Sequence, residues 1–115
     1  MRTIVLAVAV ALVAAAPAAA HVGVKSYSPK PGSTVSRSIE RVKVTFKAKI
    51  TDAKLTVKTS SGTTVSIGDG SVVNRKKTVR VRLKSGLAKG RYKATYSVLN
   101  TDGHVISKSW NFNLN

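Results

Sequence analysis

The chain has 115 residues, with 20 lysines and arginines against four acids and no cysteine. Its length suits one small domain, and the absence of cysteine excludes disulfide bridges, thiolate metal sites and cysteine nucleophiles. The formal net charge of +16 favours polyanionic partners, such as nucleic acid, acidic lipid head groups or acidic cell-wall polymers.

The first twenty residues, MRTIVLAVAVALVAAAPAAA, have the layout of a secretory signal peptide, with an early arginine, an apolar run and then small residues. The apolar run is shorter than the roughly 18 residues that a membrane span needs. Because Ala18 and Ala20 suit signal peptidase, we expect cleavage after Ala20. Residues 1–20 are then the signal peptide. Residues 21–115 form one periplasmic or secreted domain of 95 residues and formal charge +15, which begins at His21.

Strict alternation of apolar and polar residues dominates the rest of the chain and predicts half-buried strands. It begins in RVKVTFKAKI (41–50) and returns in KLTVKTS, TVRVRLKSG, RYKATYSVL and SWNFNLN. No second segment has the length and hydropathy of a membrane span, and no amphipathic helix is predicted. The residues expected to face inward include Val42, Val44, Phe46, Ala48, Ile50, Leu55, Val57, Val79, Val81, Leu83, Trp110, Phe112 and Leu114.

Glycine, proline, serine and asparagine separate these runs and predict turns. The predicted turns lie at residues 28–33, 60–63, 68–71, 85–90 and 100–104. Several short strands between such turns, in about a hundred residues, predict an all-β fold, a small antiparallel sandwich or barrel.

The positive charges fall mainly on outward strand positions and in turns, so a solvated basic face explains most of them. The aromatic residues fall mainly on inward positions, where they cannot serve as stacking platforms for bases. We therefore expect no specific nucleic-acid binding, while contact with a polyanion through the basic strand faces stays open.

The two histidines stand at conspicuous places, His21 at the predicted mature N-terminus and His104 in TDGH beside Asp102. Residues i and i+2 of an extended segment project from the same face, so Asp102 and His104 can converge while Gly103 lets the backbone turn. An N-terminal histidine can chelate one metal ion through its amine and imidazole together. Three nitrogens and one carboxylate oxygen suit Cu(II), and Zn(II) more weakly.

Simpler explanations exist for both motifs. Asp-Gly between apolar runs is often only a hairpin turn, and a histidine at a cleavage junction can be accidental. A Cu(I) site built from side-chain sulfur is excluded, because the sole methionine is Met1 and cysteine is absent.

The segments HVGVKSYSPKPGSTV and GRYKATYSVLNTDGHVISKSWNFNLN resemble the two ends of the CopC-type copper-binding (copper resistance) family. The resemblance implies an immunoglobulin-like Greek-key β-barrel or sandwich of about seven strands that binds one Cu(II) per chain. It implies that His21 supplies amine and imidazole and His104 an imidazole. Asp102 supplies a carboxylate that ligates the metal or holds a bound water. The chain lacks the methionine-rich loop of some members, and Lys108 stands where a small residue is usual.

We therefore expect a monomeric, non-enzymatic copper-binding protein for sequestration, tolerance or delivery, with an inner-membrane copper permease as a possible partner. One alternative is an envelope protein that binds polyanions through its basic strand faces. Another is a copper oxidative enzyme, since lytic polysaccharide monooxygenases also use a histidine brace. The inward aromatics and the carboxylate, which should hold Cu(II) against reduction, argue against the enzyme.

Overall fold

In the computed structural model of the chain, the described residues are 23–100 and 102–115. They form eight strands, and none of them belongs to a helix long and apolar enough to cross a membrane. The strands are β1 (Val24–Ser28), β2 (Thr34–Val35), β3 (Arg41–Phe46), β4 (Asp52–Thr59), β5 (Ser66–Val73), β6 (Thr78–Leu83), β7 (Gly90–Leu99) and β8 (Val105–Leu114).

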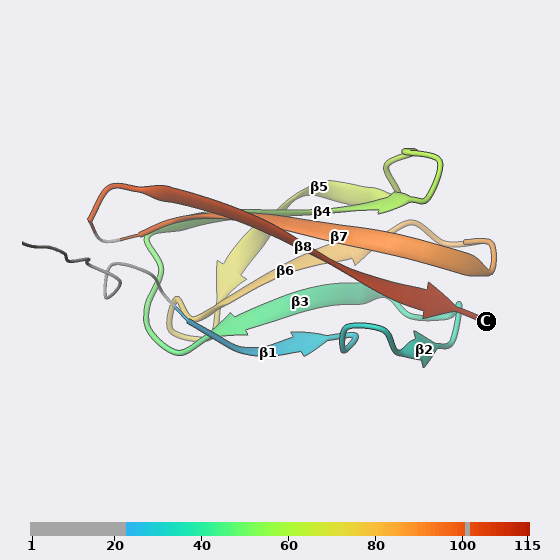
Figure 1. Cartoon of the computed structure of the whole chain (residues 1–115), viewed down its shortest axis with the longest axis horizontal. Helices are drawn as coiled ribbons and strands as arrows, with labels where there is room; N and C mark the ends of the chain where they lie inside the picture. Colours follow the sequence, from blue (N-terminus) through green and yellow to red (C-terminus); the bar gives the residue numbers. More distant parts are fainter. Residues whose placement is uncertain (1–22, 101) are drawn as a thin grey trace, which may run out of the picture.

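The strands form two four-stranded sheets that pack as a sandwich (Figure 1). Sheet A has the order β1-β3-β6-β5 and sheet B the order β2-β8-β7-β4. The predicted all-β fold is confirmed, and of the two architectures left open the structure has the sandwich. It has eight strands in place of about seven, and it is not wholly antiparallel, because the short β2 pairs in parallel with the end of β8.

The core lies between the sheets and follows the alternation in the sequence. Val42, Val44 and Phe46 of β3 are at most 1 % exposed, and they face side chains of sheet B such as Leu55 and Phe112, which are fully buried. Burying a side chain of this size stabilises the fold by about 1.5–3 kcal/mol. The inward positions predicted for β4, β6 and β8 are all buried.

The predicted inward position of Ala48 is wrong, because β3 ends at Phe46 and Ala48 is exposed. After Phe46 the chain leaves sheet A to reach β4 in sheet B, so the two-residue period is interrupted. Ile50 is nevertheless buried, and its backbone N–H donates a hydrogen bond to the carbonyl of Lys76 over 2.8 Å.

The turn predicted at residues 68–71 is also wrong, because these residues lie within β5. Gly68 and Gly70 have positive φ angles of 77° and 91°, and the pairing with β6 shifts register here, as in a β-bulge. A Cβ on Gly70 would lie 3.0 Å from the carbonyl oxygen of Arg80, so only glycine fits this close approach.

The hairpin between β5 and β6 turns instead at Asn74, Arg75 and Lys76, all with positive φ. This turn was not predicted from the sequence, because arginine and lysine are uncommon in that conformation and carry no turn signal.

Strand β8 runs the length of the sandwich, from the β7–β8 turn at one end to the C-terminus at the other (Figure 1). There the backbone N–H of Asn115 donates to the carbonyl of Val35 over 3.0 Å. The two ends of the sandwich therefore hold different parts of the C-terminal strand, and Asp102 and His104 lie at the end that carries the β7–β8 turn.

Candidate metal-binding site

The β7–β8 turn is closed by two backbone hydrogen bonds at its base. The N–H of Gly103 donates to the carbonyl of Asn100 over 3.0 Å, and the N–H of Asn100 donates to the carbonyl of His104 over 2.8 Å. Gly103 has a φ of 90°, as expected for the glycine of a three-residue hairpin loop. The Asp-Gly pair is thus a hairpin turn, and the same turn brings the flanking side chains together.

Asp102 and His104 are in direct contact, as the sequence spacing predicted. Oδ2 of Asp102 lies 2.9 Å from Nδ1 of His104, and Oδ1 accepts the backbone N–H of His104 over 3.0 Å. An ionised carboxylate can only accept hydrogen bonds, so Nδ1 of the imidazole carries the proton. Nε2 is then the ring nitrogen available to a metal ion.

The contact shifts the pKa of both groups. The ring hydrogen bond from His104, helped by its backbone N–H, lowers the pKa of the Asp102 carboxyl below its ordinary value. The same hydrogen bond and the carboxylate charge raise the pKa of His104. The imidazole is 79 % exposed and the carboxylate 31 % exposed, so solvent reaches the pair.

The third predicted ligand, His21, lies outside the described residues, as does the predicted signal peptide. Within residues 23–100 and 102–115 no three histidine, aspartate or glutamate side chains gather as a metal site. The structure brings together Asp102 and His104 only.

The described chain nevertheless begins at the same end of the sandwich as the β7–β8 turn (Figure 1). Val24, the first residue of β1, pairs with Phe46 at the end of β3. The following loop leads to Asp52, which pairs with Leu99, and Leu99 in turn pairs with Val105 just after the turn. The described chain therefore begins at the end of the sandwich that carries the Asp102–His104 pair.

Trp110 connects the N-terminal and C-terminal segments that resemble the family. The alternation of residue types predicts that its side chain is buried but not which residues it contacts. Its Nε1–H donates to the carbonyl of Pro29 over 2.9 Å, and its ring packs on Tyr27 with centroids 4.6 Å apart. These contacts fasten β8 to β1 and to the turn that follows β1. A single sequence carries no signal for such a pairing, because the partners are 81 residues apart.

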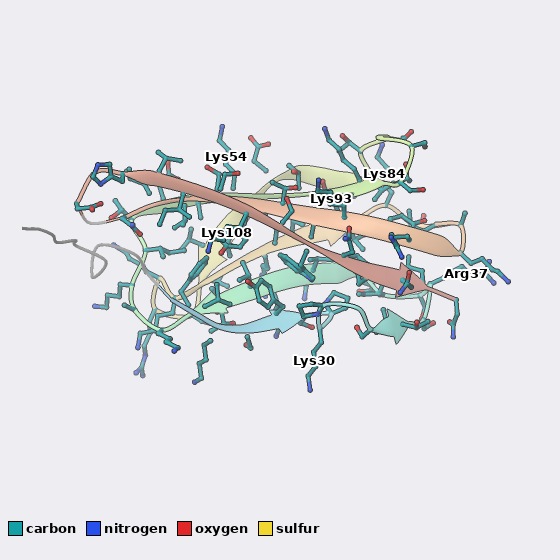
Figure 2. All side chains as sticks on the ribbon, in the orientation of Figure 1. Lys30, Arg37, Lys54, Lys84, Lys93 and Lys108 are labelled. Carbon is teal, nitrogen blue, oxygen red and sulfur yellow. The ribbon has the colours of Figure 1, made fainter. Side chains whose placement is uncertain are left out.

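Lys108 lies on the same face of β8 as Trp110 and opposite Tyr96 in the register. Its side chain is exposed, and it forms no ion pair with Asp102 in the described part of the chain (Figure 2). The one ion pair of Asp102 there is with His104.

Comparison with known proteins identifies a family model, the CopC domain, that matches residues 24–115. Among solved structures, CopC from Methylosinus trichosporium OB3b is similar, with 22% identity and a TM-score of 0.69, covering 83% of this chain and 94% of that one. PcoC, a methionine-rich copper resistance protein from Escherichia coli, has 23% identity and a TM-score of 0.67, covering 84% and 100%. At these identities the structural likeness shows the fold. No curated protein sequence matches the chain.

Proposed function

The chain belongs to the CopC domain family, and on that premise we propose that it is an exported protein that binds one Cu(II). The ligands we assign are the amine and imidazole of His21, the imidazole of His104 and the carboxylate of Asp102. This donor set of three nitrogens and one oxygen suits Cu(II), which also heads the affinity order of the divalent metals.

The observation that carries the proposal is the 2.9 Å contact between Asp102 and His104 on an exposed turn. Histidine ligands commonly donate their second ring N–H to a carboxylate, which fixes the tautomer and the ring orientation. Asp102 accepts the Nδ1–H of His104, so in the neutral imidazole Nε2 is the unprotonated nitrogen that can bind a metal ion. Each oxygen of Asp102 accepts one hydrogen bond here and retains a further lone pair, which permits direct ligation or a bound water.

The location of β1 supports His21 as the partner ligand. Gly23, two residues after His21, accepts a hydrogen bond from the backbone N–H of Lys47 over 2.9 Å, which fastens the chain at this end of the sandwich. Cleavage after Ala20 would create the amine that completes the chelate, so export and metal binding would be linked. The uncleaved chain would lack that ligand.

Sequestration, tolerance or delivery of copper outside the cytoplasm are the roles that such a site serves, with an inner-membrane permease as a candidate partner. The Escherichia coli relative is described as methionine rich, whereas this chain has a single methionine, Met1, within the predicted signal peptide. We therefore propose Cu(II) binding without a sulfur site for Cu(I), by a monomer that does not act as an enzyme.

The test is a Cu(II) titration of the protein that begins at His21, after mass spectrometry has established the N-terminus of the exported protein. We expect one tight equivalent. A variant with one glycine added before His21 keeps both imidazoles but loses the chelating amine, so it should bind far more weakly, as should His21→Ala. Equal affinity of the extended variant would show that the amine is not a ligand and would overturn the assignment.

A further inference from the structure

The outer face of sheet A carries four cations on two neighbouring strands, and we refer to it as the basic face. Arg41 and Lys43 come from β3, and Arg80 and Arg82 from β6. In the register Arg41 lies opposite Arg82 and Lys43 opposite Arg80, and all four side chains are exposed. Their inward neighbours, such as Val42 and Val81, are buried.

This arrangement places like charges in direct cross-strand pairs. Adjacent strands lie about 4.8 Å apart, and like charges opposite each other destabilise a sheet. None of the four cations forms an ion pair within residues 23–100 and 102–115. A ligand with several negative charges would relieve this repulsion. Lysines scattered over the surface would not repel one another in this way and would need no such ligand.

A hollow of about 260 Å³ lies over these strands and gives the face a defined shape. Three arginines, Arg41, Arg80 and Arg82, are among its lining residues, against a single acid, Asp69. Guanidinium groups match the oxygens of a phosphate with two parallel N–H donors. The hollow is therefore suited to a phosphate group.

A second hollow, of about 420 Å³, extends this surface along β6. It shares Arg82 and Ile67 with the first hollow and adds Arg37 and Lys84, against Glu40. Arg37 lies toward the end of the sandwich that is opposite the β7–β8 turn (Figure 2). The excess of positive charge thus continues beyond one phosphate group.

An exposed apolar side chain stands between the two hollows. Ile67 is 52 % exposed and lines both of them, and it pairs with Arg82 in the register. The aromatic residues of sheet A offer no stacking surface there, because Phe46 is buried and Tyr27 is half-buried against Trp110. Cations around an exposed isoleucine, without aromatic rings, fit a lipid surface better than a nucleic acid.

We propose that the basic face docks on a bilayer of anionic phospholipid. The guanidinium groups bind head-group phosphates, and Ile67 enters the boundary between head groups and acyl chains. Because the β7–β8 turn lies at one end of the sandwich, docking leaves the Asp102–His104 pair in contact with solvent (Figure 1). This docking needs no metal, so the proposal does not depend on whether the protein binds copper.

The test is co-sedimentation of the copper-free protein with vesicles of phosphatidylcholine and phosphatidylglycerol, compared with phosphatidylcholine alone, at about 0.15 M salt. Each cation at such a surface contributes about fivefold in affinity, so Arg41→Gln with Arg82→Gln should weaken binding about 25-fold. The matched control is Lys58→Gln with Lys93→Gln, a cross-strand pair on the outer face of sheet B that removes the same charge. This control variant should lose clearly less affinity for the mixed vesicles.

A third variant, Ile67→Ser, distinguishes a bilayer from a soluble polyanion. It should weaken binding to the mixed vesicles and leave binding to heparin or single-stranded DNA unchanged. The proposal is overturned if the wild type does not sediment with the mixed vesicles, if the two charge variants lose affinity equally, or if Ile67→Ser binds vesicles as the wild type does. Circular dichroism and urea denaturation check that each variant folds.

Discussion

The two halves of β8 differ sharply in what surrounds them, although both pair with β7 residue by residue. In the first half, Val105–Ser109, side chains are largely exposed, and Val105 reaches 66 %. In the second half, Trp110, Phe112 and Leu114 are at most 5 % exposed and pack between the sheets. The exposed half is held by the backbone ladder, by a 2.8 Å hydrogen bond between the hydroxyls of Thr95 and Ser109 and by the partly buried Ile106, whereas the buried half anchors the strand in the core. Stability and metal binding should therefore be separable by mutation.

The largest effect is expected in the buried half. Phe112→Ala removes a fully buried ring that stacks beside Tyr92 with centroids 5.9 Å apart, and it should cost about 3–5 kcal/mol of unfolding free energy. This is a large part of the total for a domain of this size, about 5–15 kcal/mol. Urea denaturation measures the loss, and Phe112→Leu should cost clearly less. A loss below about 1 kcal/mol would show that the two halves do not differ as described.

The opposite pattern is expected for His104→Ala in the exposed part. Loss of a direct ligand should weaken Cu(II) binding by more than about 100-fold, since even partners of ligands contribute about 10–100-fold. The unfolding free energy should change by less than about 0.5 kcal/mol, because the imidazole is exposed. Isothermal titration and urea denaturation of the same sample give both numbers. Full copper affinity in this variant would remove His104 from the ligand set.

A smaller effect on stability is expected where the halves meet. Trp110→Phe deletes the hydrogen bond to the carbonyl of Pro29 while keeping an aromatic ring in the core, and should cost about 1–3 kcal/mol. Copper affinity should be unchanged if β1 stays paired with β3. A parallel loss of copper affinity would show that Trp110 also holds the start of β1 in place. Stability and metal binding would then not be fully separable by mutation.

The smallest effect is the pH dependence of the Asp102–His104 contact. The lowered pKa of Asp102 gives stability that is lost as pH falls through that pKa, and the raised pKa of His104 gives stability that is lost as pH rises through that pKa. The contact therefore stabilises most between the ordinary values of 3.8 and 6.5, and weakly because both groups are exposed.

As a proposed copper ligand, His104 would bind protons in competition with the metal, so on acidification Cu(II) affinity should begin to fall at a higher pH than for an ordinary imidazole. An NMR titration of the His104 ring follows the pKa directly. Asp102→Asn should return it toward 6.5, and an unchanged pKa in that variant would show that the carboxylate is not the cause.

The alternation of residue types was enough to predict an all-β fold and most of its core, because period two decides which side chains face inward, but it did not decide between a sandwich and a barrel. The meeting of Asp102 and His104 was likewise predictable from their spacing around Gly103. The bulge at Gly68 and Gly70 could not be predicted, because glycine occurs in bulges and in turns alike. The Trp110 contact depends on two segments far apart in the chain, and His21 as a ligand stays a prediction.

The hydrogen bond from Asn115 to Val35 at the far end of β8 also has a practical consequence for handling the protein. A purification tag or a surface linker attached after Asn115 would leave the sandwich at the end opposite the β7–β8 turn (Figure 1). The same addition before His21 would cap the amine that we assign to copper. Immobilising the protein through its C-terminus is therefore the orientation that presents an intact site to a flowing copper solution.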